Sequence, residues 1–147
     1  MSYTNLLYHI VIRTKRSERT ITTQYERDLY AYIYAIVKSY KCVLYRINGM
    51  PDHVHLLVSI TPSLALSDFM RVLKTSTSKM LKMHKDKFPM FDGWGAEYFA
   101  CTLSESLKET VRQYIMNQKE HHKQINTRDE IIKLCNEFGI TYNEKYI

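Results

Sequence analysis

The pattern of apolar positions along the chain changes repeatedly between short β-rich runs and longer stretches with helical spacing. Residues Tyr3–Arg13 are rich in β-branched and aromatic types, which predicts a first strand followed by a polar loop. Apolar residues then recur at helical spacing up to about Tyr40, and Thr22 or Thr23 is placed to cap this helix. The chain is therefore expected to begin with a strand and a helix.

Two short strands are predicted next, at about Lys41–Ile47 and Val54–Ile60. The segment Asn48–Asp52 between them contains Asn-Gly and Pro, which are typical of a tight turn. We therefore expect the two strands to form an antiparallel hairpin. A basic helix follows, with Ser63 or Ser67 as its N-cap.

The second half of the chain predicts one more strand and two more helices. Pro89–Gly95 is expected to be a loop, Tyr98–Cys101 a short strand, and about Leu107–His122 a helix. A last amphipathic helix over about Arg128–Phe138 should end at Gly139, a residue suited to that position. This order predicts an α+β fold of the ferredoxin-like (split βαβ, RRM-like) type in a single domain, residues 1–147. Such a fold has a four-stranded antiparallel sheet with two helices on one face.

Length and composition narrow the class of protein. The chain has 147 residues, 45% apolar and 24% charged, which is ordinary for a globular domain and excludes a disordered or fibrous protein. No apolar run approaches the roughly 18 residues of a membrane-spanning helix, and no secretory signal is visible. We therefore expect a cytoplasmic protein. The three cysteines, Cys42, Cys101 and Cys135, lack metal-binding spacing and are expected in or near the core.

An excess of basic side chains favours polyanionic partners. Lys and Arg number 21 against 15 Asp and Glu, a formal net charge of +6. Charge of this kind suits nucleic acid, although alone it does not decide the partner. The candidate phosphate contacts follow the first strand or lie on the second helix: Arg13, Lys15, Arg16, Arg71, Lys74 and Lys79.

The segment His53-Val54-His55 is the first candidate for chemistry. Alternate residues of a strand point to one face, so the two imidazoles should project together, with Val54 on the opposite side. Two imidazole nitrogens provide half of a divalent metal site. The same pattern also suits two histidines on a sheet face without a ligand.

Tyr114 and Gln118 are the second candidate. Residues four apart lie over one another on a helix, which brings this phenol and amide within about 6 Å. An amide oxygen can bind a metal, and a phenol can be a covalent nucleophile once something activates it, since its ordinary pKa is about 10. A plain tyrosine on an apolar helix side has the same pattern. His121, near the same face, is a further candidate ligand or proton carrier, or a solvated histidine at a helix end.

Together, and in this order, the two candidates resemble a known family. Gly49–Val58 is similar to the His-hydrophobic-His (HUH) strand of single-strand DNA nucleases. Tyr114–Gln118 is similar to the nucleophile helix of the single-tyrosine transposases of small insertion sequences (TnpA type). The first strand with its basic turn, the second helix and the fourth strand of that family resemble Tyr8–Lys15, Phe69–Ser78 and Trp94–Phe99. The resemblance covers nearly the whole chain.

The resemblance implies a specific chemistry. His53, His55 and Gln118 would bind one Mg²⁺ or Mn²⁺, which can polarise a scissile phosphate. Tyr114 would attack that DNA phosphate and leave a 5′-phosphotyrosine and a free 3′-hydroxyl, so that rejoining needs no ATP. The substrates would be single-stranded DNA hairpins at the ends of an insertion element. The active protein would be a homodimer in which the tyrosine helix completes the partner's site or its own.

Three other interpretations stay open at this point. A domesticated, repeat-associated tyrosine transposase acting on chromosomal palindromes would share the chemistry. A non-catalytic nucleic-acid-binding module would fit because ferredoxin-like sheets also bind RNA through aromatic residues, although the glycine- and aromatic-rich strand of such modules is missing. A zinc hydrolase built on His53 and His55 lacks an obvious third histidine or carboxylate at motif spacing.

Overall fold

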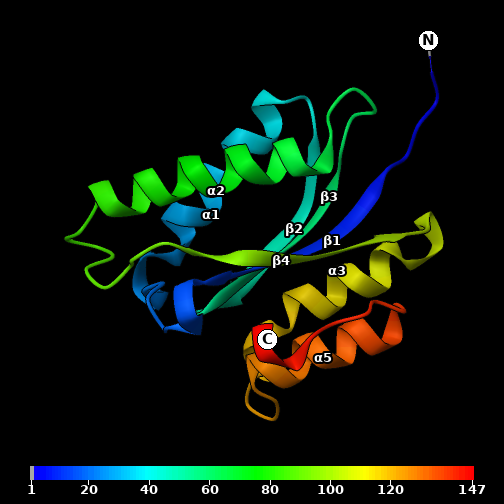
Figure 1. The fold of residues 1–147 in the computed structure, drawn as a ribbon. Coiled ribbons are helices and arrows are strands. Elements are labelled where there is room, and N and C mark those ends of the chain that lie inside the picture. Colours follow the sequence, from blue (N-terminus) through cyan, green and yellow to red (C-terminus); the bar gives the residue numbers. More distant parts are fainter. Residues whose placement is uncertain (1) are drawn as a thin grey trace.

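Four antiparallel strands form one sheet in the computed structural model, which describes residues 2–147 (Figure 1). The strands are β1 Leu7–Thr14, β2 Val43–Met50, β3 His53–Ser59 and β4 Trp94–Leu103. Their order in the sheet is β2-β3-β1-β4, so β1 and β3 are the two central strands. With a helix between β1 and β2 and another between β3 and β4, this is the split βαβ arrangement, and the predicted ferredoxin-like fold is confirmed.

The helices cover both faces of the sheet. They are α1 Glu26–Ser39, α2 Leu66–Met83, α3 Lys108–Met116, α4 Gln118–His121 and α5 Thr127–Glu137, with short 3₁₀ turns at Lys15–Ser17, Thr23–Tyr25, Glu105–Leu107 and Glu144–Tyr146. Figure 1 shows α1 and α2 on one face, and α3 and α5 on the other. No helix within residues 2–147 is long and apolar enough to cross a membrane.

The face under α1 and α2 carries the larger apolar core. Alternate residues of β1 and β3 point to it, and they pack against the apolar sides of both helices. Fully burying one such side chain stabilises a fold by about 1.5–3 kcal/mol. The core includes Ile10, Ile12, Val54, Leu56 and Val58 from the strands, and Leu29, Ile33, Val37, Phe69, Leu73 and Leu81 from the helices.

The opposite face combines a smaller apolar cluster with polar residues. Val11 and Phe99 of the sheet pack against α5 through Ile131, Leu134 and Cys135. α5 ends as predicted before Gly139, whose φ of 66° suits a residue without a Cβ. The chain then turns back, and Ile140, Tyr142 and Ile147 pack onto the same cluster. This packing fixes α5 against the sheet.

The β2–β3 hairpin is tighter than predicted. β2 continues through Asn48 and Gly49, so these residues are in the ladder and the turn lies at Pro51 and Asp52. A Cβ on Gly49 would lie 2.2 Å from the carbonyl oxygen of His53. The glycine is therefore needed because the two strands approach closely beside His53, and the prediction of an Asn-Gly turn was wrong.

Several predicted boundaries also differ from the structure. β1 begins at Leu7, four residues after the predicted start, and β4 includes Trp94 and Gly95, which were expected in a loop. The predicted helix Leu107–His122 is divided at Asn117 into α3 and α4. A strand end or a helix break of this kind depends on tertiary contacts that local propensity does not contain.

The capping and cysteine predictions had different outcomes. Tyr25 and Ala65 occupy the N-cap positions of α1 and α2 without a side-chain hydrogen bond, so the predicted Thr and Ser caps were wrong. All three cysteines are free, with Cys42 and Cys135 buried and Cys101 half-buried. The expectation that they are core or near-core residues is confirmed.

Candidate active site

His53 and His55 lie on β3 and point to the face that α3, α4 and α5 cover. Val54 between them belongs to the opposite core, as the strand periodicity predicted. Both imidazoles are fully buried. A buried imidazole needs partners for its ring nitrogens, so the surroundings of these two side chains define the site.

The Nδ1 atom of each imidazole has a hydrogen-bond partner on another residue. His53 Nδ1 lies 2.7 Å from Asp52 Oδ1, and Thr127 of α5 donates its hydroxyl to the other carboxylate oxygen of Asp52 at 2.7 Å. His55 Nδ1 lies 2.8 Å from His9 Nε2 on the neighbouring strand β1. Such contacts fix ring orientation, and here they turn both Nε2 atoms toward one point, as in metal sites whose histidines are oriented by outer partners.

The surroundings shift the pKa values of His53 and His55 in opposite directions. Burial alone would lower the pKa of His53, but hydrogen bonds to Asp52 and Glu130 outweigh it and raise that pKa to about 9. Burial dominates for His55 and lowers its pKa to about 4, so its imidazole is neutral near pH 7. Strongly shifted pKa values of this kind are common at functional sites.

Tyr114 and Gln118 reach the histidines from helices α3 and α4 of the same chain. The Tyr114 ring is half-buried, with its centroid 5.9 Å from that of His55 and 6.0 Å from that of His9. Gln118 is fully buried, and its Oε1 lies 3.2 Å from His53 Nε2. The structure thus brings all four predicted residues to one place, although Asn117 interrupts the helix between the tyrosine and the glutamine.

Two polar side chains anchor the break between α3 and α4 to the hairpin. The Asn48 side-chain amide donates to the carbonyls of Ile115 and Met116, each at 3.1 Å. Lys119 Nζ donates to Asn48 Oδ1 at 3.1 Å and to Glu26 Oε2 of α1 at 2.9 Å. These bonds satisfy the free carbonyls at the end of α3 and hold the tyrosine against its own sheet.

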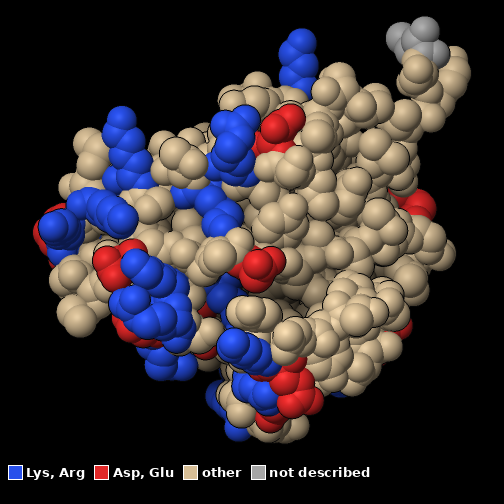
Figure 2. Space-filling view, in the orientation of Figure 1, with Lys and Arg blue, Asp and Glu red and all other residues tan. Residues whose placement is uncertain are grey.

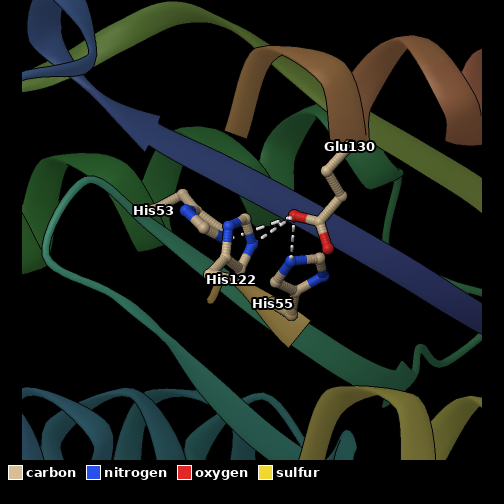
Figure 3. A group of neighbouring side chains, drawn as sticks. All are labelled: His53, His55, His122 and Glu130. Carbon is tan, nitrogen blue, oxygen red and sulfur yellow. Dashed lines mark hydrogen bonds and ion pairs between the residues drawn. The ribbon is translucent and has the colours of Figure 1, made fainter. Parts of the chain in front are cut away.

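Two residues that the sequence analysis missed complete the cluster. Glu130 of α5 and His122 at the end of α4 meet His53 and His55, and Figure 3 shows one carboxylate oxygen facing all three imidazoles. A signal for Glu130 was present in the sequence, since it adjoins the apolar positions Ile131, Leu134 and Cys135 on one side of a helix. An acid on an apolar helix face is seldom buried without a partner.

His121, which the sequence analysis considered, lies at the edge of the cluster. Its Nε2 is 3.4 Å from the Tyr114 hydroxyl and 3.4 Å from Glu130 Oε2, and its side chain is 24% exposed. The neighbouring His122 is only 4% exposed and lies 2.9 Å from Glu130 Oε1. Of the twin histidines, His122 is therefore the one that faces the cluster.

Comparison with known proteins identifies the family. The family described as "Transposase IS200 like" matches residues 2–118, which include His53, His55, Tyr114 and Gln118. The chain belongs to this family. It is thus a transposase of the HUH single-tyrosine class, a DNA endonuclease and strand transferase.

Individual relatives agree with the family match. The chain is 27% identical over 119 residues to the ISDra2 transposase TnpA of Deinococcus radiodurans, which covers 78% of this chain and 85% of that relative. It is 25% identical over 123 residues to the transposase for insertion sequence element IS200 of Salmonella typhimurium, covering 81% and 80% of the two chains.

Solved structures share the fold. A crystal structure of a Deinococcus radiodurans R1 protein assigned as a transposase superposes with a TM-score of 0.62 at 29% identity, covering 80% of this chain and 93% of that one. A REP-associated tyrosine transposase bound to a REP hairpin superposes with a TM-score of 0.61 at 15% identity, covering 85% and 76%. At that identity the second similarity shows the fold alone.

The donor set of this transposase fits a divalent metal ion. Three imidazole nitrogens and a carboxylate oxygen, from His53, His55, His122 and Glu130, lie within 4.8 Å of one another. Nitrogen and oxygen donors so close together can surround a single ion. The side chains of His53, His55, Gln118 and Glu130 are fully buried, so the site is closed to a DNA phosphate in this arrangement.

The predicted phosphate contacts fall into two groups. Figure 2 shows Lys and Arg gathered on the side of the molecule that carries the C-terminal half of α2 and the turn after β1. There Lys15, Lys74 and Lys79 line a shallow groove with Trp94, and Arg71 joins Lys74 in the adjoining one.

Arg13 and Arg16 line a separate groove beside the C-terminal segment. Arg16 pairs with Glu18 at 2.8 Å and with Asp92 at 3.1 Å. Arg13 lies beside the C-terminal segment and donates to the carbonyl of Tyr146 at 3.2 Å. The structure therefore groups Lys15, Arg71, Lys74 and Lys79 on one surface and separates Arg13 from them.

Proposed function

We propose that this transposase cleaves and rejoins single-stranded DNA through Tyr114, with His53, His55 and Gln118 holding Mg²⁺ or Mn²⁺. One observation supports the proposal above all others: a phenol, an amide oxygen and two oriented imidazoles meet at one buried point of a single chain. Neither the histidine pair nor the tyrosine alone would support this proposal. Together they provide the metal ligands and the nucleophile that a metal-assisted phosphoryl transfer requires.

The chemistry requires a defined set of bond changes. The Tyr114 oxygen attacks the phosphorus, the bond from phosphorus to the 3′-oxygen breaks, and the 5′-phosphate stays on the tyrosine. The 3′-oxygen leaves and takes up a proton, and rejoining reverses these changes with a 3′-hydroxyl as nucleophile. A bound divalent ion supplies a Lewis acid that polarises the scissile phosphate.

The residues around Tyr114 hold its proton before attack. Burial and the nearby Glu130 carboxylate raise the pKa of Tyr114 well above its usual range, so the phenol is protonated in this closed arrangement. Its hydroxyl donates to Glu130 Oε2, which is thus the acceptor nearest to the proton that must leave. The nucleophile becomes reactive only after the charge of the site changes, which metal and phosphate binding would bring about.

The mixed donor set favours Mn²⁺ over Mg²⁺. Imidazole nitrogen suits transition metals, whereas carboxylate and amide oxygens suit Mg²⁺ and Mn²⁺, so Mn²⁺ accepts both kinds of donor. We expect either ion to support cleavage, with tighter binding of Mn²⁺.

The proposed substrates are single-stranded DNA hairpins at the ends of an insertion element, in the cytoplasm. A structural relative was solved with a REP hairpin bound, which supports this substrate class. The grooves lined by Lys15, Arg71, Lys74 and Lys79 provide positive charge for the phosphates, and Arg13 and Arg16 would contribute once their protein partners are released. Binding should weaken with salt, by a log–log slope of about −0.7 per phosphate neutralised.

We also propose that the protein acts as a homodimer whose subunits can share the tyrosine helix. The contacts of α3 and α4 with the sheet form within one chain here, and the same contacts could form between two copies. Mixing Tyr114→Phe with His53→Ala protein tests this: restored cleavage indicates a shared site. If the mixture stays inactive while each variant still dimerises, the tyrosine acts on its own sheet.

A denaturing gel tests the tyrosine chemistry directly. Purified protein is mixed with single strands from the flanks of the element, labelled at the 3′ end, and with Mn²⁺. We expect a labelled band at the mass of protein plus DNA, absent with Tyr114→Phe and with duplex DNA. Tyr34→Phe, on the exposed side of α1, is the matched control and should form the adduct. Binding on native gels without an adduct under any metal would contradict the proposal and favour a binding module.

A further inference from the structure

We propose that Glu130 of α5, together with His122, binds the metal ion of the tyrosine site. The segment after residue 118 would then be part of the catalytic centre, although the family match ends there. This inference rests on the proposed metal-dependent function and assigns it two more ligands.

The first argument is the number of groups that converge on one oxygen. Glu130 Oε1 lies 2.9 Å from His122 Nε2, 3.1 Å from His55 Nε2 and 3.3 Å from His53 Nε2 (Figure 3). A carboxylate oxygen has about two lone-pair directions, so three imidazole donors exceed what it can accept with good geometry. The arrangement is better explained by four donor atoms that share a cation.

The orientation of His53 strengthens this argument. When His53 gives up its Nε2 proton, as a metal ligand must, Nδ1 still donates to Asp52 and Nε2 presents a lone pair. That lone pair faces two further acceptors, Gln118 Oε1 at 3.2 Å and Glu130 Oε1 at 3.3 Å. Lone pairs that face one another in a buried site repel unless a proton or a metal ion lies among them.

The spacing agrees with a single ion. Metal–nitrogen and metal–oxygen bonds of about 2.0–2.2 Å place neighbouring ligand atoms about 2.8–3.1 Å apart in octahedral geometry and about 3.3–3.6 Å apart in tetrahedral geometry. The separations of Glu130 Oε1 from His53 and His55 Nε2, and of Gln118 Oε1 from His53 Nε2, are 3.1–3.3 Å. These three separations lie within the range for neighbouring ligands, and the four donor atoms of His53, His55, His122 and Glu130 lie within 4.8 Å of one another.

The charge of Glu130 also needs a partner. Its side chain is fully buried, and within residues 2–147 its ion pairs are all with histidines. A buried carboxylate is costly unless it is paired or coordinates a metal. A divalent cation that replaces the Nε2 proton of His53 would supply that charge at the same place.

The second oxygen of Glu130 connects the ion to the nucleophile. Oε2 accepts the Tyr114 hydroxyl, and it accepts the Gln118 side-chain amide at 2.9 Å. One carboxylate therefore reaches the metal position through Oε1 and both residues of the nucleophile helices through Oε2. This makes α5 the element that sets the tyrosine relative to the metal.

Metal binding to the full chain tests the inference without relying on activity. Mn²⁺ affinity is measured by calorimetry, and the Mn²⁺-induced rise in melting temperature is measured in parallel. Loss of outer-sphere partners already weakens metal sites by about 10- to 100-fold, so we expect Glu130→Gln to weaken Mn²⁺ binding by about 100-fold and to remove most of the rise. Glu137→Gln, an exposed position on the same helix, should bind Mn²⁺ like the wild type.

The outcomes separate this inference from the proposed function. If the wild type binds Mn²⁺ and His53→Ala does not, but Glu130→Gln binds normally, Glu130 is no ligand and the proposed function stands. If Glu130→Gln lowers the metal-free melting temperature and keeps the full Mn²⁺-induced rise, Glu130 only ties helices together and the inference is overturned. No Mn²⁺ binding by the wild type would overturn both. Glu130→Asp, which keeps the charge but retracts it, should show an intermediate affinity and serves if the Gln variant does not fold.

Discussion

The two faces of β3 show how one strand serves two purposes. On one side, Val54 and Leu56 pack into the apolar core under α1 and α2. On the other side, His53 and His55 face a polar cluster built from α3, α4 and α5. Successive residues of β3 therefore belong alternately to the apolar core and to the candidate active site.

The faces differ in how far their parts are spread along the sequence. The apolar face is formed by strand and helix patterns that repeat within each element, so many substitutions of similar size could maintain it. The polar face depends on single side chains from β1, β3, α4 and α5 that meet at one point. We therefore expect substitutions on the first face to change stability, and those on the second to change chemistry.

Removing the metal or a ligand should have the largest effect. Excess EDTA or His55→Ala is expected to reduce adduct formation by about 1,000-fold or more, because losing several kcal/mol of Lewis-acid stabilisation corresponds to such a factor. Cleavage rates on labelled single strands measure this effect. His84→Ala, whose histidine lies outside the cluster at the end of α2, is the control and should cleave normally. Undiminished cleavage in EDTA would show that the polar face works without a metal.

Leu56→Ala should lower stability and leave the chemistry intact. Leu56 is fully buried in the apolar core, so truncation leaves a cavity and should reduce the free energy of unfolding by about 2–5 kcal/mol. Urea titration measures the change. Tyr34→Ala, at an exposed position of α1, is the control and should change the free energy of unfolding little. At temperatures well below melting, Leu56→Ala should still form the covalent adduct. Loss of the adduct in the folded variant would show that the two faces are not separable.

The sequence predicted the parts of the molecule that depend on local pattern. The order of strands and helices, the common direction of His53 and His55, and the end of α5 at Gly139 all follow from periodicity or single-residue preferences. Helical spacing placed Tyr114 and Gln118 on one helix face, the family resemblance singled them out, and the break at Asn117 did not separate them. These features need little knowledge of the tertiary fold.

Long-range contacts explain what the sequence did not reveal. Glu130 and His122 join the cluster only because α5 packs on the sheet through Ile131 and Leu134, and nothing in their spacing to His53 predicts this contact. Asn48 and Gly49 were misplaced in a turn for the same reason. In the structure, Gly49 permits the close approach of β2 and β3, while the Asn48 side chain binds the end of α3.

Asn48→Ala should have the smallest effect of these changes, and it tests how the nucleophile helix is held on the polar face. The Asn48 amide holds the carbonyls of Ile115 and Met116, and Lys119 connects it to Glu26 of α1. Losing these bonds leaves half-buried carbonyls without a partner, which costs about 1–3 kcal/mol. Since this cost falls on the nucleophile helix, we expect the cleavage rate to drop about tenfold, and Mn²⁺ affinity to change less because His53 and His55 stay in place.

Asn136→Ala, an exposed asparagine of α5, is the control for both measurements. If Asn48→Ala lowers the melting temperature but leaves cleavage unchanged, the anchor only stabilises the fold. A fall in cleavage without an equal fall in Mn²⁺ affinity would show that the hairpin positions the tyrosine separately from the metal. The polar face would then consist of two units, a metal site on β3 and a nucleophile held in place from β2.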